Sequence, residues 1–98
     1  MVESKNWTNY ETQSVYEHLV NDDPEVANYW KHRTKVVLQE NNDDYYQTVR
    51  ALGIEIQSRV EVGNPLADDG SLYDELLTWA LGDVEWSDVA EQFINEFR

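Results

Sequence analysis

The chain has 98 residues, which is enough for one domain with a single hydrophobic core. Twenty Asp and Glu residues face seven Lys and Arg residues, so the formal net charge is -13. Proteins that bind duplex nucleic acid or a membrane surface need the opposite charge, which argues against both functions. The absence of cysteine excludes disulfide bonds, thiol chemistry and a cysteine-type zinc site.

Hydropathy patterning also excludes a membrane span, because the sequence contains no run of 18 apolar residues. The first residues, MVESKNW, lack the apolar region of a secretion signal, so we expect a cytoplasmic location in the host cell. Six Tyr, four Trp and two Phe residues can bury a large area, and they compensate for the short chain.

The first helix is predicted to run from about Tyr10 to Val20. Thr8 and Glu11 have the spacing of a capping box, in which the Thr8 hydroxyl accepts a bond from the amide three residues on and Glu11 reaches back to the Thr8 amide. Helical spacing assigns five side chains to the inward stripe of this helix: Thr12, Val15, Tyr16, Leu19 and Val20.

The second helix is predicted to run from Pro24 to about Gln39, with Asp23 as its N-cap. Proline suits the first helical position because its missing amide hydrogen would have no partner there. Five residues form the predicted apolar face: Val26, Tyr29, Trp30, Val36 and Val37. Three of the seven basic residues lie towards the C-terminal half: Lys31, Arg33 and Lys35. We expect these cations to pair with nearby carboxylates.

The third helix is predicted to begin near Tyr45, after a polar break, and to run to about Val60. Its apolar stripe is predicted to contain five residues: Tyr45, Val49, Leu52, Ile56 and Val60. Gly53 lies beside this stripe, which predicts that another helix approaches closely at that point. Glu55 and Arg59 have the spacing of a stabilising i,i+4 ion pair.

A loop is predicted from Val62 to Asp69, because glycine, asparagine and proline follow one another there. The fourth helix is predicted to run from Leu72 to Leu81, with Ser71 or Asp69 as its cap. Four of its residues are predicted to face inward: Tyr73, Leu76, Leu77 and Ala80.

The fifth helix is predicted to follow at once, with a cap near Asp83 or Glu85. Six residues form a regular amphipathic stripe: Trp86, Val89, Ala90, Phe93, Ile94 and Phe97. The predicted polar face carries Asp88, Glu91 and Glu96. These segments together predict an all-α fold, in which residues 1–98 form one acidic domain built as a compact bundle of four or five helices.

The two ends of the chain carry short motifs. One is Asn9-Tyr10-Glu11-Thr12 followed by Asn21-Asp22, and the other is Val84-Glu85-Trp86-Ser87-Asp88-Val89-Ala90-Glu91. In these motifs the chain resembles a family of small, largely uncharacterised proteins of bacteria, archaea and their phages, over about a third of its length. Gln13 departs from that pattern, which commonly has an aromatic residue after the threonine. The resemblance implies a mobile-element gene and, by class analogy, an anti-CRISPR or other anti-defence protein.

Residues that could carry catalysis or hold a metal are sparse. His18 and His32 lie on different helices without a second ligand at metal-binding spacing, and the paired aspartates do not match a calcium loop. Ser14, Ser58, Ser71 and Ser87 have no neighbouring base. A substrate cleft of about 300 Å³ or more is also hard to form in a bundle of this size. We therefore expect a protein that is not an enzyme and uses no metal or cofactor.

The acidic surface has three interpretations: a solvated face, adaptation to high salt, and mimicry of nucleic acid. Duplex DNA carries one negative charge per about 1.7 Å, so a stretch as long as this domain carries roughly 20 charges. The leading hypothesis is an inhibitor that occupies a basic nucleic-acid-binding surface of a host defence nuclease or CRISPR complex. The carboxylates expected to bind this partner lie where helices begin: Asp22, Asp23, Glu25, Asp43, Asp44, Asp68 and Asp69.

The alternative hypothesis is a general protein–protein interaction module or a homodimer that uses an aromatic face. Tyr and Trp are effective interface anchors, and the sequence is rich in both. Tyr29 and Trp30 are the aromatic residues expected to contact the partner. This hypothesis predicts binding that does not depend on salt.

Overall fold

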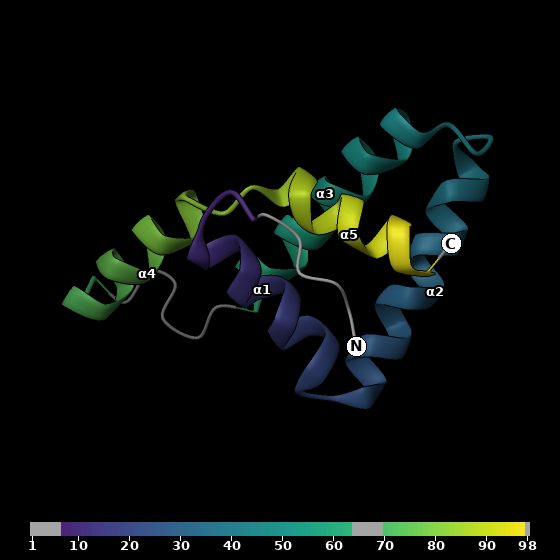
Figure 1. The fold of residues 1–98 in the computed structure, drawn as a ribbon. Helices are drawn as coiled ribbons and strands as arrows, with labels where there is room; N and C mark the ends of the chain where they lie inside the picture. Colours follow the sequence, from purple (N-terminus) through teal and green to yellow (C-terminus); the bar gives the residue numbers. More distant parts are fainter. Residues whose placement is uncertain (1–6, 64–69, 98) are drawn as a thin grey trace.

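A computed structural model describes residues 7–63 and 70–97 of the chain. The described residues form helices and contain no strand, which confirms the prediction of an all-α bundle (Figure 1). The five helices are α1 (Tyr10–Asn21), α2 (Pro24–Glu40), α3 (Tyr45–Val62), α4 (Leu72–Gly82) and α5 (Trp86–Phe97). No helix in these two ranges is long and apolar enough to cross a membrane.

Side-chain caps start three of the helices where the sequence predicts them. Asp23 accepts a hydrogen bond from the amide of Glu25 at 2.9 Å, and Pro24 occupies the first turn of α2. Asp44 caps α3 through the amide of Gln47, also at 2.9 Å. Ser71 caps α4, which decides between the two caps that the sequence allows. Each cap satisfies an amide that has no partner inside its helix.

The predicted capping box at Thr8 is wrong, because Asn9 is the N-cap of α1. The Asn9 carboxamide oxygen accepts bonds from the Thr12 amide at 2.9 Å and the Thr12 hydroxyl at 2.6 Å. The Thr8 hydroxyl instead donates to the Asp88 carboxylate of α5 at 2.5 Å. The Thr12 hydroxyl accepts a bond from the Glu85 amide at 2.9 Å, so the start of α1 also fixes the chain just before α5.

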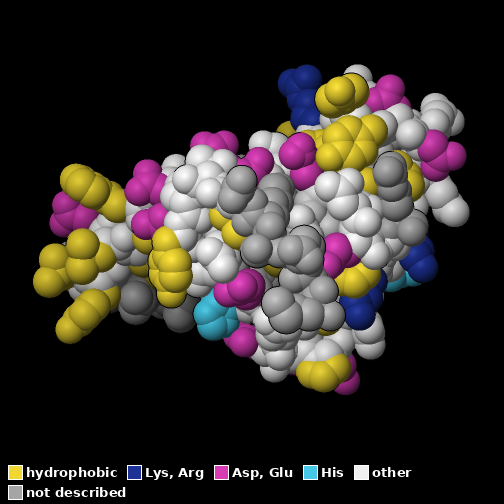
Figure 2. Space-filling model, in the orientation of Figure 1, with side chains coloured by type: hydrophobic (Ala, Val, Ile, Leu, Met, Phe, Trp, Pro, Cys, Tyr) yellow, Lys and Arg dark blue, Asp and Glu magenta, His cyan; other side chains and the backbone are white. Residues whose placement is uncertain are grey.

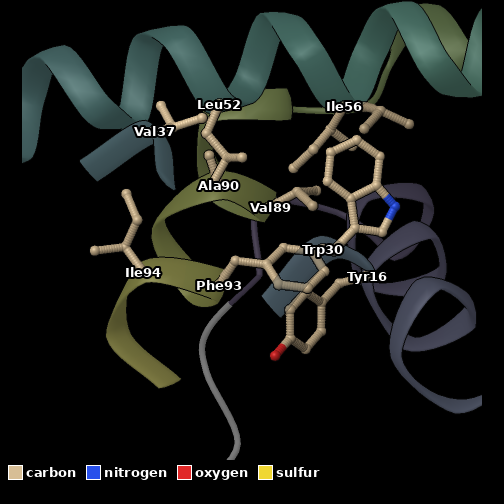
Figure 3. Packing of buried hydrophobic residues seen from close by; sticks show 10 residues of the cluster. Tyr16, Trp30, Val37, Leu52, Ile56, Val89, Ala90, Phe93 and Ile94 are labelled. Carbon is tan, nitrogen blue, oxygen red and sulfur yellow. The ribbon is translucent and has the colours of Figure 1, made fainter. Parts of the chain in front are cut away.

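The core is built around α5, which packs against α1, α2 and α3 (Figure 3). Four side chains of α5 are fully buried: Val89, Ala90, Phe93 and Ile94. They meet Leu52 and Ile56 from α3, Trp30 and Val37 from α2, and Tyr16 from α1. This arrangement confirms the predicted stripe of α5. Apolar residues repeat about every 3.6 positions in all four helices, so one side of each helix is buried.

Aromatic contacts join α1, α2 and α5 inside this core. The Phe93 ring lies edge-on to Tyr16 at 4.9 Å and tilted to Trp30 at 6.5 Å, between ring centroids. The Tyr16 hydroxyl donates a hydrogen bond to the Glu96 carboxylate, so Glu96 does more than face solvent on α5. Burial, followed by this bond to an anion, raises the pKa of Tyr16 well above its ordinary value of 10.0.

The glycine in α3 has the function that its place in the sequence predicts. A Cβ atom on Gly53 would lie 3.3 Å from the carbonyl oxygen of Trp86, at the first turn of α5. Because that neighbour is backbone, it cannot turn aside as a side chain could. Gly53 therefore permits the close approach of α5 to α3 that encloses Leu52 and Ile56.

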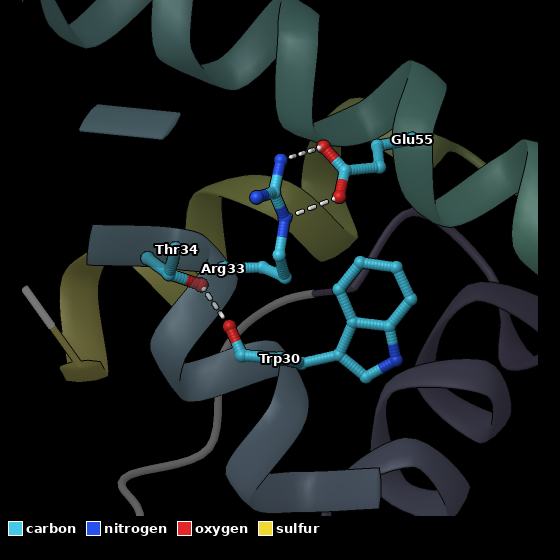
Figure 4. Close-up of polar contacts among 4 residues, drawn as sticks. All are labelled: Trp30, Arg33, Thr34 and Glu55. Atoms are coloured by element: carbon cyan, nitrogen blue, oxygen red, sulfur yellow. Dashed lines mark hydrogen bonds and ion pairs between the residues drawn. The ribbon is translucent and has the colours of Figure 1, made fainter. Parts of the chain in front are cut away.

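The predicted pair of Glu55 with Arg59 is wrong, because Glu55 pairs with Arg33 of α2 (Figure 4). The Arg33 guanidinium donates two bonds to that carboxylate, at 2.6 Å and 3.0 Å, and they raise the pKa of Arg33. Arg59 lies over the Tyr29 ring, 5.2 Å from its centroid. Packing of α2 on α3 brings the Arg33 guanidinium to Glu55 in a two-pronged geometry, while the Arg59 guanidinium lies on the Tyr29 ring.

The predicted loop after α3 begins later than expected, because Val62 is the last residue of the helix. Gly63 follows the helix and is described, whereas residues 64–69 of the predicted loop lie outside the described residues. Two of the candidate partner-binding carboxylates, Asp68 and Asp69, fall in this range.

Candidate functional site

The candidate carboxylates of the described chain divide into two separate groups. Asp22, Asp23 and Glu25 lie where α1 turns into α2, and Asp43 and Asp44 lie where α2 turns into α3 (Figure 1). The 17 residues of α2 separate the groups by about 25 Å, at 1.5 Å per residue. The fold therefore does not bring the predicted carboxylates together in one site.

Several of these carboxylates have a local structural role. Asp23 and Asp44 cap their helices, and Asp22 contacts the His18 ring at 2.6 Å between carboxylate oxygen and ring nitrogen. Asp43 has a left-handed backbone conformation, with a φ of 61°, in the turn before α3. All four residues remain exposed, so these roles do not prevent contact with a partner.

Cations interrupt the surface between the two groups. Lys31, Arg33 and Lys35 lie along α2, and the Lys31 ammonium sits 5.0 Å from the centre of the Phe97 ring. Only Arg33 has the expected carboxylate partner among the ion pairs of the described chain. The sequence of α2 thus offers no unbroken acidic track of the kind that a duplex presents.

The prediction that Trp30 is an exposed anchor is wrong. Its side chain is 1% exposed, because α2 turns it towards Phe93 at the centre of the bundle. Tyr29 stays partly exposed, with its ring edge-on to Trp30 at 5.0 Å. Of the predicted aromatic pair, only Tyr29 is available to a partner.

Charge is distributed unevenly over the five helices. All five Lys and Arg residues of the described ranges lie on α2 and α3, so α1, α4 and α5 carry none. Nine carboxylates lie on those three helices and on the link between the last two: Glu11, Glu17, Asp74, Glu75, Asp83, Glu85, Asp88, Glu91 and Glu96. We call α1, α4, α5 and that link the cation-free region, because no Lys or Arg belongs to them, although Lys31 of α2 reaches the Phe97 ring at the end of α5.

The prediction that α4 packs inward is wrong for Tyr73 and Leu76. No residue of α4 is buried, and α4 is not among the helices that pack on α5. Four large side chains form an exposed surface that we call the α4 face: Leu72 (65% exposed), Tyr73 (69%), Leu76 (56%) and Trp79 (71%). Figure 2 shows apolar side chains projecting at the end of the molecule where Figure 1 draws α4. The buried stripe of α5 is already covered by α1, α2 and α3, so within residues 7–63 and 70–97 no helix packs extensively on α4.

An apolar groove lies between α4 and α1. Its volume is about 400 Å³, which exceeds what the sequence predicts for so small a bundle. Leu77, Ala80 and Leu81 form its α4 wall, and Val15 and Leu19 of α1 lie opposite. Aliphatic walls of this kind exclude water from whatever fills them, and they favour apolar contact.

One polar trio lies near this groove, two members on α1 and the third at its C-cap. Ser14 and His18 line the groove, and Asp22 follows at the same helical spacing and contacts the His18 ring. No hydrogen bond joins Ser14 to His18 in the described structure, and the His18 and Asp22 side chains are 67% and 63% exposed. The trio therefore lacks the hydrogen bond between nucleophile and base that is typical of an activated serine.

Groups of three or more histidine, aspartate or glutamate side chains able to hold a metal do not occur in residues 7–63 and 70–97. Comparisons of the chain with protein-family models, curated proteins and solved structures found no match. The likeness of its two ends to a phage-associated family therefore stays a prediction.

Proposed function

We propose that the protein is an acidic binding protein that covers a basic surface of a partner protein. The observation that carries this proposal is the cation-free region, in which seven carboxylates on three helices and two on the link between α4 and α5 occur with no Lys or Arg. In the view of Figure 2, dark blue cationic side chains gather away from the end formed by α4. A surface of one charge attracts the opposite charge and repels its own.

The partner that fits such a surface is a protein that itself binds nucleic acid. This chain would occupy the basic groove of that partner, so that nucleic acid is excluded by steric overlap and by electrostatic repulsion. Association of this kind is fast and weakens as salt rises, because ions screen exposed charges beyond about 10 Å at 0.1 M. Direct binding of nucleic acid by this chain is opposed by the same charge.

The biological setting that we propose is inhibition of a host defence nuclease or CRISPR complex. This step rests on the resemblance of the two terminal motifs to phage-associated proteins, together with the chemistry of the partner. We assign the main contact to the cation-free region, and a smaller part to the carboxylates at the two ends of α2.

The test is capture of partners from nuclease-treated host lysate, read by mass spectrometry at low and high salt. We expect a basic nucleic-acid-binding protein that is lost at high salt. The variant Glu75→Gln/Asp83→Asn/Glu85→Gln should weaken its binding about tenfold. The matched variant Glu25→Gln/Glu40→Gln/Asp43→Asn removes the same charge beside the cations of α2 and should weaken binding much less.

Two outcomes contradict the proposal. One is a partner that is not basic and is retained equally at both salt concentrations. The other is an equal loss of binding in the two charge variants, which would mean that net charge alone matters and no region is preferred.

A second candidate function is an interaction module or homodimer that uses exposed aromatic side chains. The observation that favours it is the exposure of Tyr73 and Trp79 on α4. It predicts association that persists at high salt, which sedimentation of the purified protein at two salt concentrations measures directly.

A further inference from the structure

The α4 face and the neighbouring groove form one apolar surface. Tyr73, Leu77 and Ala80 follow the i, i+4, i+7 spacing of one side of a helix, so the exposed ring of Tyr73 continues the wall that Leu77 and Ala80 give to the groove. Leu76 and Trp79 extend the surface round the helix away from α1. A partner lying along α4 could therefore contact the projecting face and enter the groove.

Four large apolar side chains gather on this surface: Leu72, Tyr73, Leu76 and Trp79. Scattered single apolar residues are ordinary on a protein surface, but a joined patch of about 300–600 Å² is often functional. Trp79 and Tyr73 can each bury roughly 150–250 Å² when covered. Leu72, Tyr73, Leu76 and Trp79 are not part of the buried core, so they are available for contact with a partner.

Carboxylates border this surface, and no Lys or Arg of residues 7–63 and 70–97 lies on α4, on α1 or on the link after α4. Glu75 lies on α4 itself, Asp83 and Glu85 follow its end, and Glu11 lies at the rim of the groove. An occupant must therefore be apolar along its centre and basic along its edges. An amphipathic helix with leucine-like residues on one side and Lys or Arg on its flanks meets both requirements.

A second copy of this chain fits the surface poorly. Each copy carries a net charge of -13, and pairing two α4 faces would oppose one acidic border with another.

We propose that the α4 face and its groove dock a basic amphipathic helix of the partner protein. This inference rests on the proposed function for the charge of the partner, and it adds the contact site and the shape of the segment bound there. The carboxylates steer the helix, and Trp79, Leu76 and the groove hold it.

The experiment measures binding of three synthetic helical peptides to the full chain by calorimetry. The first has leucine on one face and lysine on the flanks, the second has glutamate in place of lysine, and the third has glutamine in place of leucine. The test variant is Leu76→Ala/Trp79→Ala. The matched control is Tyr46→Ala/Ile54→Ala on α3, where the two side chains are similarly exposed, at 83% and 59%.

The expected result is that the leucine–lysine peptide binds tightest and that the test variant weakens it by at least about tenfold. The control variant should stay within about twofold of the native affinity. Equal affinity of the native protein and the test variant would overturn the inference. Sedimentation of the native chain as a dimer that the test variant abolishes would also overturn it, because a second copy would then be the occupant.

The third peptide separates this inference from the proposed function. If the glutamine–lysine peptide binds as well as the leucine–lysine peptide, the acidic surface attracts cations and the docking site on α4 is refuted. If neither basic peptide binds at low salt, the proposed function fails together with the inference.

Discussion

Two neighbouring helices of almost equal length, α4 with 11 residues and α5 with 12, have opposite surroundings. Val89, Ala90, Phe93 and Ile94 of α5 are fully buried, whereas every large side chain at the start of α4 is exposed. Both segments are rich in apolar residues, so apolar content does not decide which helix is buried. The decisive factor is whether other helices already cover the available core.

The pattern within each helix gives part of the explanation. Apolar residues of α5 follow one stripe and leave its other side polar, as a helix seated on a core requires. In α4 the apolar residues occupy most of the circumference, so no single packing partner can bury all of them. This comparison predicts that substitutions in the two regions have very different costs.

The largest expected effect is that of Trp30→Ala. This change removes the bulkiest fully buried side chain, which packs on Phe93 of α5. We expect the free energy of unfolding to fall by about 3–5 kcal/mol, because a cavity forms at the centre of the bundle. Urea unfolding of the two proteins measures the difference. A loss below about 1 kcal/mol would contradict the central position of Trp30.

The next largest effect is expected at the contact between α3 and α5. Gly53→Leu should lower the free energy of unfolding by about 1–3 kcal/mol, because the new side chain meets the backbone of Trp86. Gly82→Ala is the matched control, since open space surrounds that glycine at the end of α4. It should leave stability unchanged or raise it by up to about 1 kcal/mol. Equal costs at the two positions would refute the close approach.

A pH-dependent effect is expected at Tyr16, where α1 meets α5. Its pKa is raised in the folded chain, so above pH 10 the unfolded chain loses this proton while the folded chain keeps it. The stabilisation is complete below pH 10 and falls at higher pH, by up to about 1.4 kcal/mol per pH unit. Tyr16→Phe should remove this component, which unfolding at a series of alkaline pH values detects. Parallel pH profiles for the two proteins would contradict it.

Most of the fold follows from local signals in the sequence. Asp23 with Pro24, the regular stripe of α5 and Gly53 beside the stripe of α3 each predict what the structure contains. These features act within one or two turns of a helix, where sequence spacing and spatial neighbourhood agree. The ion pair of Glu55 was less predictable, because Arg33 lies 22 residues away.

The candidate site was predicted less well, for a physical reason. Spacing along the chain cannot reveal that α2 holds the two aspartate groups apart, or that Trp30 turns into the core. The exposed α4 face had one signal, the spread of apolar residues around that helix, but exposure depends on how α1, α2 and α3 cover α5. The uneven distribution of cations is visible in the sequence, but only the helix boundaries show that the cations of the described residues all lie on α2 and α3.

The smallest expected stability effect gives the most direct test of this comparison. The measurement is the free energy of unfolding of Leu76→Ala/Trp79→Ala, set beside that of Trp30→Ala. Because α4 lies outside the core, the double variant should stay within about 0.5 kcal/mol of the native protein. A loss of about 3 kcal/mol or more, equal to that of Trp30→Ala, would show that α4 packs into the core in solution and would contradict the account.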